Sequence, residues 1–159
     1  MILLLKNLAF SLLIPGTVAV FGPLFIIEGA VDYSGWLVLL GSMLLLAGFA
    51  IYCWCVWDFA IFGRATPAPI DAPKRLVVRG LYRFSRNPMY VGVLCVIFGW
   101  ALFYAALGVF IYGLSVAICL QLFIVFYEEP LLQQLFGVEY GEYKSSVNRW
   151  LPNYQFSSF

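Results

Sequence analysis

Two short segments contain most of the side chains that could carry out chemistry. The first runs from Gly80 to Tyr90 and includes two arginines, an asparagine and two tyrosines, and the second is the pair Glu128-Glu129. A charged side chain at the centre of a membrane helix costs at least about 2.5 kcal/mol on insertion scales, so charges beside apolar runs are informative. We interpret the two segments as halves of a cofactor site. Arginine contacts with lipid phosphates and helix capping by the glutamates are the alternative.

The composition defines the class of protein to which this chain belongs. Of its 159 residues, 64% are hydrophobic and 11% are charged, which is outside the range of soluble domains. The sequence therefore predicts an all-α integral membrane protein. A net charge of +1, with the basic residues next to apolar runs, gives no reason to expect a nucleic-acid partner. The four cysteines lie in apolar runs and the chain has no histidine, so no metal site is expected.

Four apolar runs predict about four transmembrane helices, at residues 8–27, 35–57, 89–107 and 108–127. A secretory signal is the competing interpretation of the first run, but the run is longer than a signal core and no cleavage site follows it. The last two runs have about twenty residues each and should be separated by a tight turn at Gly108. They form an antiparallel hairpin, which would bring Tyr90 and Glu128 to the same depth.

The basic residues predict the orientation of the chain. All nine fall before the first run, between the second and third runs, or after the fourth, and the two remaining loops have none. The positive-inside rule then places both termini and the cofactor site on the cytoplasmic side of a bacterial or archaeal membrane. After the fourth run, Glu128-Glu129-Pro130 is typical of a helix start, and the apolar stripe that follows predicts an interfacial tail helix.

We expect residues 1–159 to form a single membrane domain. Its parts are two N-terminal spans (1–62), a cytoplasmic loop (63–88), the helical hairpin (89–127) and a cytoplasmic tail (128–159), with the cofactor site formed by 74–90 and 128–152. Gly41 and Gly48 have the same seven-residue spacing as Gly92 and Gly99, which suits close helix packing.

Three motifs together indicate a family. They are Leu76-Val77 with Gly80-Leu81-Tyr82, then Arg86-Asn87-Pro88-Met89-Tyr90 at the start of the hairpin, and finally Glu128-Glu129, Phe136-Gly137, Glu139-Tyr140, Tyr143 and Arg149-Trp150-Leu151-Pro152. From about Gly35 to Pro152 the chain resembles the integral membrane methyltransferases that include isoprenylcysteine carboxyl methyltransferases and bacterial phospholipid methyltransferases.

The resemblance implies S-adenosylmethionine as the cofactor. The cofactor-binding residues that it implies are Arg75, Leu76, Val77, Tyr82, Asn87, Pro88, Met89, Tyr90 and Glu128. The candidate catalytic residues are Arg86, Tyr90 and Glu129. Arg86 would pair with the methionyl carboxylate, and only Glu128, Glu129, Tyr90 or water is available as a base.

Two positions depart from the family pattern. Asn87 stands where the family has histidine, which preserves polar contacts and removes a titratable group. Ile124 stands where an isoprenylcysteine methyltransferase has an arginine for its substrate carboxylate. Carboxyl methylation of a prenylated cysteine is therefore disfavoured.

The expected function is methyl transfer from S-adenosylmethionine to a lipid or lipophilic small molecule. Methyl transfer from a sulfonium depends mainly on alignment, which can supply about 7–11 kcal/mol of the barrier. The acceptor should enter sideways from the bilayer, and membrane lipids are the other expected partners. An isoprenylcysteine-type carboxyl methyltransferase and a non-enzymatic lipid-binding protein remain as alternatives. The sequence leaves the acceptor and the oligomeric state open.

Overall fold

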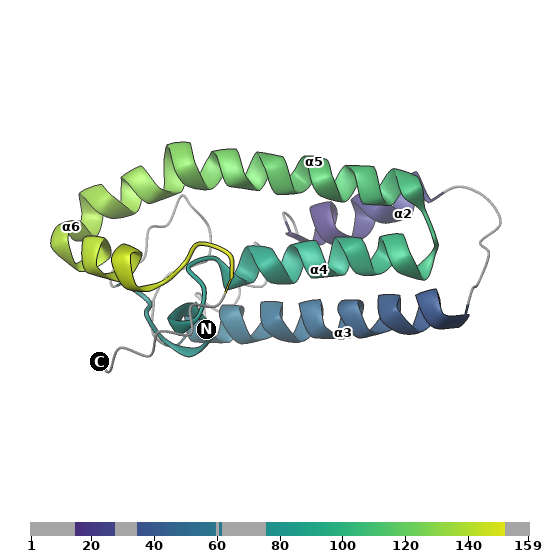
Figure 1. Ribbon diagram of the computed structural model, residues 1–159, viewed down its shortest axis with the longest axis horizontal. Coiled ribbons are helices and arrows are strands. Elements are labelled where there is room, and N and C mark those ends of the chain that lie inside the picture. The colour runs from purple at the N-terminus through teal and green to yellow at the C-terminus, as the bar shows by residue number, and fades with distance from the viewer. Residues whose placement is uncertain (1–14, 28–34, 60, 62–75, 152–159) are drawn as a thin grey trace.

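The computed structural model describes residues 15–27, 35–59, 61 and 76–151. Within these ranges the chain is helical or irregular and forms no strand, which agrees with the all-α prediction. The elements are η1 (Thr17–Phe21), α2 (Gly22–Ile26), α3 (Gly35–Asp58), η3 (Gly80–Arg83), α4 (Pro88–Phe103), α5 (Leu107–Phe123), η4 (Ile124–Glu128) and α6 (Glu129–Ser146). Figure 1 shows α3, α4 and α5 side by side, with α2 against α4 and α5 and with α6 at one end of the bundle.

Two helical stretches are long and apolar enough to cross a membrane. One is α3, whose 24 residues match the predicted second span, and the other is the continuous run Leu107–Ser146. The segment Thr17–Ile26 and the 16-residue α4 are apolar but shorter. At about 1.5 Å per residue α4 extends about 24 Å, less than a hydrocarbon core of about 30 Å. Residues 8–14 of the predicted first span lie outside the described residues.

Glycines allow α3 and α4 to approach each other closely. A Cβ atom on Gly48 would lie 2.7 Å from the carbonyl oxygen of Gly92, and a Cβ atom on Gly41 would lie 2.9 Å from that of Gly99. Real Cβ atoms essentially never show contacts this short, so a side chain at these positions would force the two backbones apart. The close packing predicted from the glycine spacing is confirmed, and the pairing 41 with 99 and 48 with 92 shows that the helices are antiparallel.

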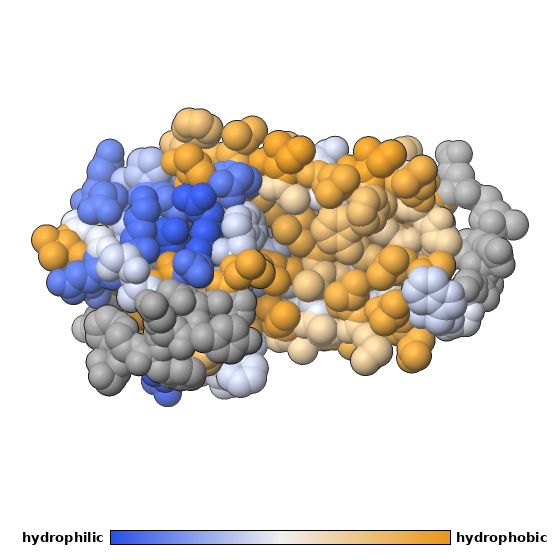
Figure 2. Space-filling view, in the orientation of Figure 1, coloured by the Kyte–Doolittle hydropathy of each residue, from blue (hydrophilic) through white to orange (hydrophobic). Residues whose placement is uncertain are grey.

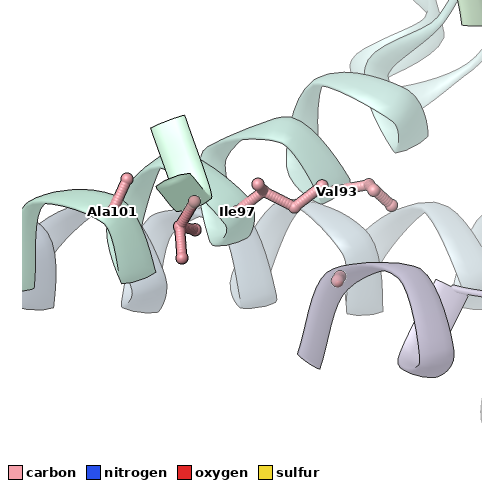
Figure 3. Packing of buried hydrophobic residues seen from close by; sticks show 5 residues of the cluster. Val93, Ile97 and Ala101 are labelled. Carbon is pink, nitrogen blue, oxygen red and sulfur yellow. The ribbon is translucent and has the colours of Figure 1, made fainter. Parts of the chain in front are cut away.

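A small apolar core lies where α4 meets its other neighbours. Val93, Ile97 and Ala101 follow one face of α4 (Figure 3). They form one buried cluster with Val109 of α5 and Ala19 of η1, and Ile97 and Val109 are completely buried. The spacing of four residues puts the three α4 side chains on the same face of the helix. This core holds α4, and with it the start of α4, in a fixed position within the bundle.

The turn of the hairpin differs from the prediction. Gly108 lies inside α5, and the turn is made by Ala105, which has a positive φ of 47°. Ala106 N donates to Ala101 O at 2.8 Å and Ala105 N donates to Leu102 O at 3.1 Å, which is the hydrogen-bond pattern of a Schellman cap. The prediction was wrong because an alanine, and not the glycine, takes the left-handed conformation at this cap.

The predicted helix start at Glu128-Glu129-Pro130 coincides with the start of α6 at Glu129, but no break in the helix precedes it. The chain continues from α5 through the π-helical turn η4 into α6 without a break, and Glu128 has helical backbone angles. Pro130 has no N–H to donate, and its ring would collide with a carbonyl group of the preceding α-helical turn. The wider π turn, in which Glu129 N donates to Ile124 O, accommodates it. The chain bends later, at Gly137, whose φ is +51°.

Polar residues gather at one end of the molecule. Figure 2 shows hydrophilic residues around α6 and the start of α4, and an apolar surface over most of the remaining length of the bundle. Large side chains on that surface are exposed, for example Leu46 on α3 at 72% and Ile118 on α5 at 61%. A contiguous apolar surface of this kind is typical of contact with lipid. The candidate site lies at the polar end.

Candidate functional site

The side chains of Tyr90 and Glu128 meet at the polar end of the bundle. Tyr90 is in the first turn of α4 and Glu128 is the last residue of η4. The Tyr90 hydroxyl donates a hydrogen bond to Glu128 Oε2 at 2.9 Å. The prediction that the hairpin brings these two residues to the same depth is therefore confirmed. Glu128 Oε1 has no hydrogen-bond partner within the described part of the chain, so it is available to a ligand donor.

Glu129 binds three cationic side chains. Its Oε1 lies 3.0 Å from Arg86 Nη1 and 2.8 Å from Arg149 Nε, and its Oε2 lies 3.0 Å from Lys144 Nζ. Glu129 follows the apolar run, which ends at Tyr127. Burial alone would raise the pKa of Glu129, but hydrogen bonds from Arg149 and Lys144 and the charge of Arg86 bring that pKa below its usual range.

These contacts make Glu129 a stable anion and a weak proton acceptor at neutral pH. What the structure assigns to it is the positioning of Arg86 and of the C-terminal segment. Its catalytic role stays a prediction.

Arg86 keeps one donor free. Its side chain is 9% exposed, and Nη1 bonds Glu129 and, at 3.4 Å, the hydroxyl of Tyr140. The buried Nε has no hydrogen-bond partner among the residues that the structure describes. A guanidinium N–H suits a carboxylate acceptor. Arg86 therefore fits the predicted partner of a methionyl carboxylate, and its other contacts fix its orientation.

The segment before α4 is tied to the C-terminal tail by hydrogen bonds to tail carbonyl groups. Arg86 N donates to Asn148 O at 2.9 Å, Ser85 Oγ donates to Arg149 O at 3.0 Å, and Asn87 Nδ2 donates to Arg149 O at 3.2 Å. Asn87 and Ser85 are both buried. Asn87 thus keeps a polar contact that a histidine N–H could also make, and its contact holds the tail against the start of α4.

Two further hydrogen bonds fix the tail. Tyr143 Oη donates to Tyr82 O at 2.7 Å, and Trp150 Nε1 donates to Gln121 Oε1 of α5 at 2.8 Å. Tyr143 also belongs to a buried cluster with Tyr140 and Val147. The motif residues Tyr143 and Trp150 therefore have a structural role. They hold the second half of α6 and the residues after it against the segment before α4 and against α5.

The segment 76–83 lies between α3 and the tail. Leu76 packs against the tail cluster, and Val77 is buried in a cluster with Tyr82 and Cys55 of α3. Tyr82 packs against Cys55 and makes an edge contact with the ring of Phe59. Burial raises the pKa of Tyr82, so its hydroxyl is protonated at neutral pH. Among the described residues, no backbone hydrogen bond uses the N–H groups of Leu76 and Val77.

The remaining predicted cofactor residues are at the start of α4 or outside the described part of the chain. Pro88 and Met89 are buried, and Met89 packs in the cluster of Cys55 and Tyr82, so a ligand would meet its backbone sooner than its side chain. Arg75 lies outside the described residues. That these residues contact a cofactor stays a prediction.

The sequence interpretation missed two features of this region. It treated Lys144 only as an orientation signal, whereas the structure pairs it with Glu129. It assigned no role to Asp58, whereas Asp58 is 5% exposed and packs beside Gly80. A lone carboxylate at the end of an apolar span is a signal that could have identified Asp58, because such groups are costly to bury.

Ile124 occupies the position at which, by the resemblance described above, an isoprenylcysteine methyltransferase has an arginine for its substrate. It is 1% exposed and lies in η4, one turn before Glu128. No cationic side chain can reach a substrate carboxylate from this position. The structure thus gives the apolar residue a packing role.

Comparisons with known proteins agree with the motifs. A family described as Phospholipid methyltransferase matches residues 36–139, well over half of the chain. Methanethiol S-methyltransferase 1 of Bradyrhizobium diazoefficiens is 27% identical over 123 residues, which are 77% of this chain and 40% of the relative. The chain therefore spans less than half the length of that curated relative. No solved structure matches the chain.

Proposed function

Because the chain belongs to the phospholipid methyltransferase family, we propose that it is an S-adenosylmethionine-dependent membrane methyltransferase acting on a lipophilic acceptor. The family membership agrees with the resemblance inferred from the motifs. The observation that carries the proposal is the hydrogen bond between Tyr90 and Glu128, which joins the two halves of the predicted cofactor site at 2.9 Å.

The free polar groups of the site suit this cofactor. Arg86 Nε is a buried donor for the methionyl carboxylate, and Glu128 Oε1 is an acceptor that also provides negative charge near a cationic sulfonium. The backbone N–H groups of Leu76 and Val77 are further donors. S-adenosylmethionine supplies an activated methyl group, and the residues of the chain bind and orient it.

The site supports alignment more than proton transfer. Glu129 is held as an anion by three cations, and Tyr82 is a buried, protonated phenol. The chain has no histidine. Tyr90 and Glu128 are the remaining candidates for a proton acceptor, and their mutual hydrogen bond orients both. The acceptor should therefore be nucleophilic before it reaches the site.

The acceptor is proposed to be lipophilic because the site borders an apolar, lipid-type surface (Figure 2). A thiol is a second candidate, since one relative is named as a methanethiol S-methyltransferase. A thiolate needs no general base, which suits this site. A prenylcysteine carboxylate is disfavoured because the buried Ile124 offers it no cationic partner.

We also propose four spans with both termini and the site in the cytoplasm. The chain has nine basic residues, none of them in 28–34 or 104–106, the loops at the opposite end of the spans. A C-terminal green fluorescent protein fusion should fluoresce and an alkaline phosphatase fusion should be inactive. The reverse pattern would contradict this orientation.

Calorimetry on the full chain in detergent micelles tests the cofactor. S-adenosylhomocysteine should bind, and Glu128→Gln should weaken binding about tenfold or more, the effect of losing a charge-assisted hydrogen bond. Glu142→Gln, at an exposed carboxylate of α6, is the matched control and should bind as the unaltered protein does. If the unaltered protein binds neither the product nor S-adenosylmethionine, the proposal is wrong.

Methyl transfer is measured with labelled S-adenosylmethionine. A bacterial lipid extract, a small alkanethiol and a farnesylcysteine analogue are offered separately. Label in the lipid fraction supports the lipophilic acceptor, and label in the thiol supports the second candidate. Binding without transfer to any of the three would favour a non-enzymatic role.

A further inference from the structure

Asp58 is a buried carboxylate that no contact of the site explains. It is the last residue of α3 and is 5% exposed. Its Oδ2 has no hydrogen-bond partner among the described residues, and no ion pair of the described part of the chain includes it. Burying a carboxylate oxygen without a donor costs free energy that a protein normally avoids. A donor from a bound ligand would remove this cost.

Gly80 packs closely against the carboxylate of Asp58. Gly80 has a φ of +57°, which L side chains rarely adopt, and a Cβ atom on it would collide with Asp58 Oδ2. The same Cβ position lies 3.0 Å from the indole Nε1 of Trp54. An acceptor and a donor therefore converge over a glycine. The two groups are not hydrogen-bonded to each other or to other described residues.

Asp58 borders the predicted cofactor site from the α3 side. Cys55, one turn earlier in α3, packs against Tyr82 in one buried cluster. The backbone oxygen of Tyr82 instead accepts from Tyr143 of the tail. Tyr82 thus contacts both α3, which carries Asp58, and the tail, whose Glu129 pairs with Arg86.

We propose that Asp58 accepts hydrogen bonds from the vicinal ribose hydroxyls of the nucleoside cofactor, an inference that rests on the function proposed above. S-adenosylmethionine has three kinds of N–H or O–H donor. The ammonium is attached to the same carbon as the carboxylate that we assign to Arg86. It should therefore lie near Arg86 and the tail, and not near Asp58. Its adenine amine adjoins a ring nitrogen acceptor that would repel a carboxylate. The two hydroxyls match the two oxygens of one carboxylate, and acidic residues bind ribose hydroxyls in this way in other nucleotide sites.

The test combines a protein variant with a ligand analogue. Calorimetry on the full chain in micelles compares S-adenosylhomocysteine with its 2′-deoxy analogue, for the unaltered protein, Asp58→Asn and the control Glu142→Gln. Asp58→Asn should weaken binding of S-adenosylhomocysteine about ten- to hundredfold, as expected for a hydrogen bond to a charged group. The 2′-deoxy change should weaken binding to the unaltered protein and to the control, and should have little further effect on Asp58→Asn.

Thermal unfolding without ligand separates this role from a structural one. Asp58→Asn should unfold at the same temperature as the unaltered protein or a higher one, because it removes an unpaired buried charge. Equal affinities of Asp58→Asn and the unaltered protein, or equal losses from the deoxy change in both, would overturn the inference while the proposed function stands. Failure of the unaltered protein to bind S-adenosylhomocysteine at all would overturn both.

Discussion

The ion pairs of Glu129 lead to a quantitative prediction for Glu129→Gln. The substitution keeps the shape of the side chain and removes the charge that faces Arg86, Arg149 and Lys144. If Glu129 positions the tail, its loss should release the segment from Tyr140 to Arg149 from the start of α4. If Glu129 were only a proton acceptor, the tail would stay in place.

The free-energy cost of Glu129→Gln follows from how exposed each cationic partner of Glu129 is. The Arg86 side chain is 9% exposed, so the variant leaves a buried charge without its partner, which costs about 3–5 kcal/mol. The Arg149 side chain is 27% exposed and that of Lys144 is 47% exposed, and ion pairs open to water contribute about 0–1 kcal/mol each. The Tyr140 hydroxyl remains near Arg86 and offsets part of the loss. We expect a net cost of about 3 kcal/mol.

Hydrogen exchange measured by mass spectrometry is the assay, because it resolves local opening. In Glu129→Gln, peptides covering 140–151 should exchange about a hundredfold faster, and peptides of α3 should change little. Lys144→Gln is the matched control and should accelerate exchange no more than about fivefold. Equal effects of the two variants, or acceleration in α3 as large as in the tail, would refute the reasoning.

The carboxylate of Glu129 predicts that the stability of the tail depends on pH. The pKa of Glu129 is lowered from its ordinary value of 4.5, so the folded state binds this proton less readily than the unfolded state does. The stabilisation is therefore complete above about pH 4.5 and is lost as the pH falls through the lowered pKa. Tail protection, corrected for intrinsic exchange, should decline in this range in the unaltered protein. Glu129→Gln should lack the decline, and an identical pH profile would contradict the assignment.

Three further experiments test the bundle and the site. Gly48→Ala should lose about 1–3 kcal/mol of stability in detergent melts, because its Cβ would lie 2.7 Å from a backbone oxygen of α4, whereas Gly35→Ala, with nothing within 4 Å, should be neutral. Ala105→Gly should gain about 0.5–1 kcal/mol by relieving a φ of 47°, and a lower melting temperature would contradict this. In calorimetry, Tyr90→Phe and Glu128→Gln should weaken cofactor binding less than additively, because each loses the same hydrogen bond; strict additivity would argue against coupling.

Much of the fold could be read from local patterns. The apolar run of α3 was predicted from Gly35 to Trp57 and is observed from Gly35 to Asp58, because a long uninterrupted apolar run has few alternatives to a helix. The glycine spacing predicted close packing of α3 and α4, since only residues without a Cβ atom allow backbones to approach that closely.

Details of the connections were less predictable. The hairpin turn was placed at Gly108 but is made by Ala105. The helix start expected at Glu128-Glu129-Pro130 coincides with the start of α6, but the chain reaches it through a π turn without a break. Sequence rules that treat each segment in isolation specify neither detail. Hydrogen bonds to the carbonyl groups of Ala101 and Leu102 stabilise Ala105 in the left-handed conformation. Pro130 lacks a backbone donor, but the wider π turn accommodates it and the helix continues.

The sequence by itself determined the class of the protein and the common depth of Tyr90 and Glu128, and it predicted the two segments of the candidate site. These follow from periodicity, length and the cost of charge near lipid. Only the tertiary structure decided what the charged groups contact. It assigned Glu129 to three cations and left Arg86 Nε and Asp58 Oδ2 without partners in the described chain. Such contacts depend on side chains far apart in sequence and on burial, neither of which the spacing of residues along a chain specifies.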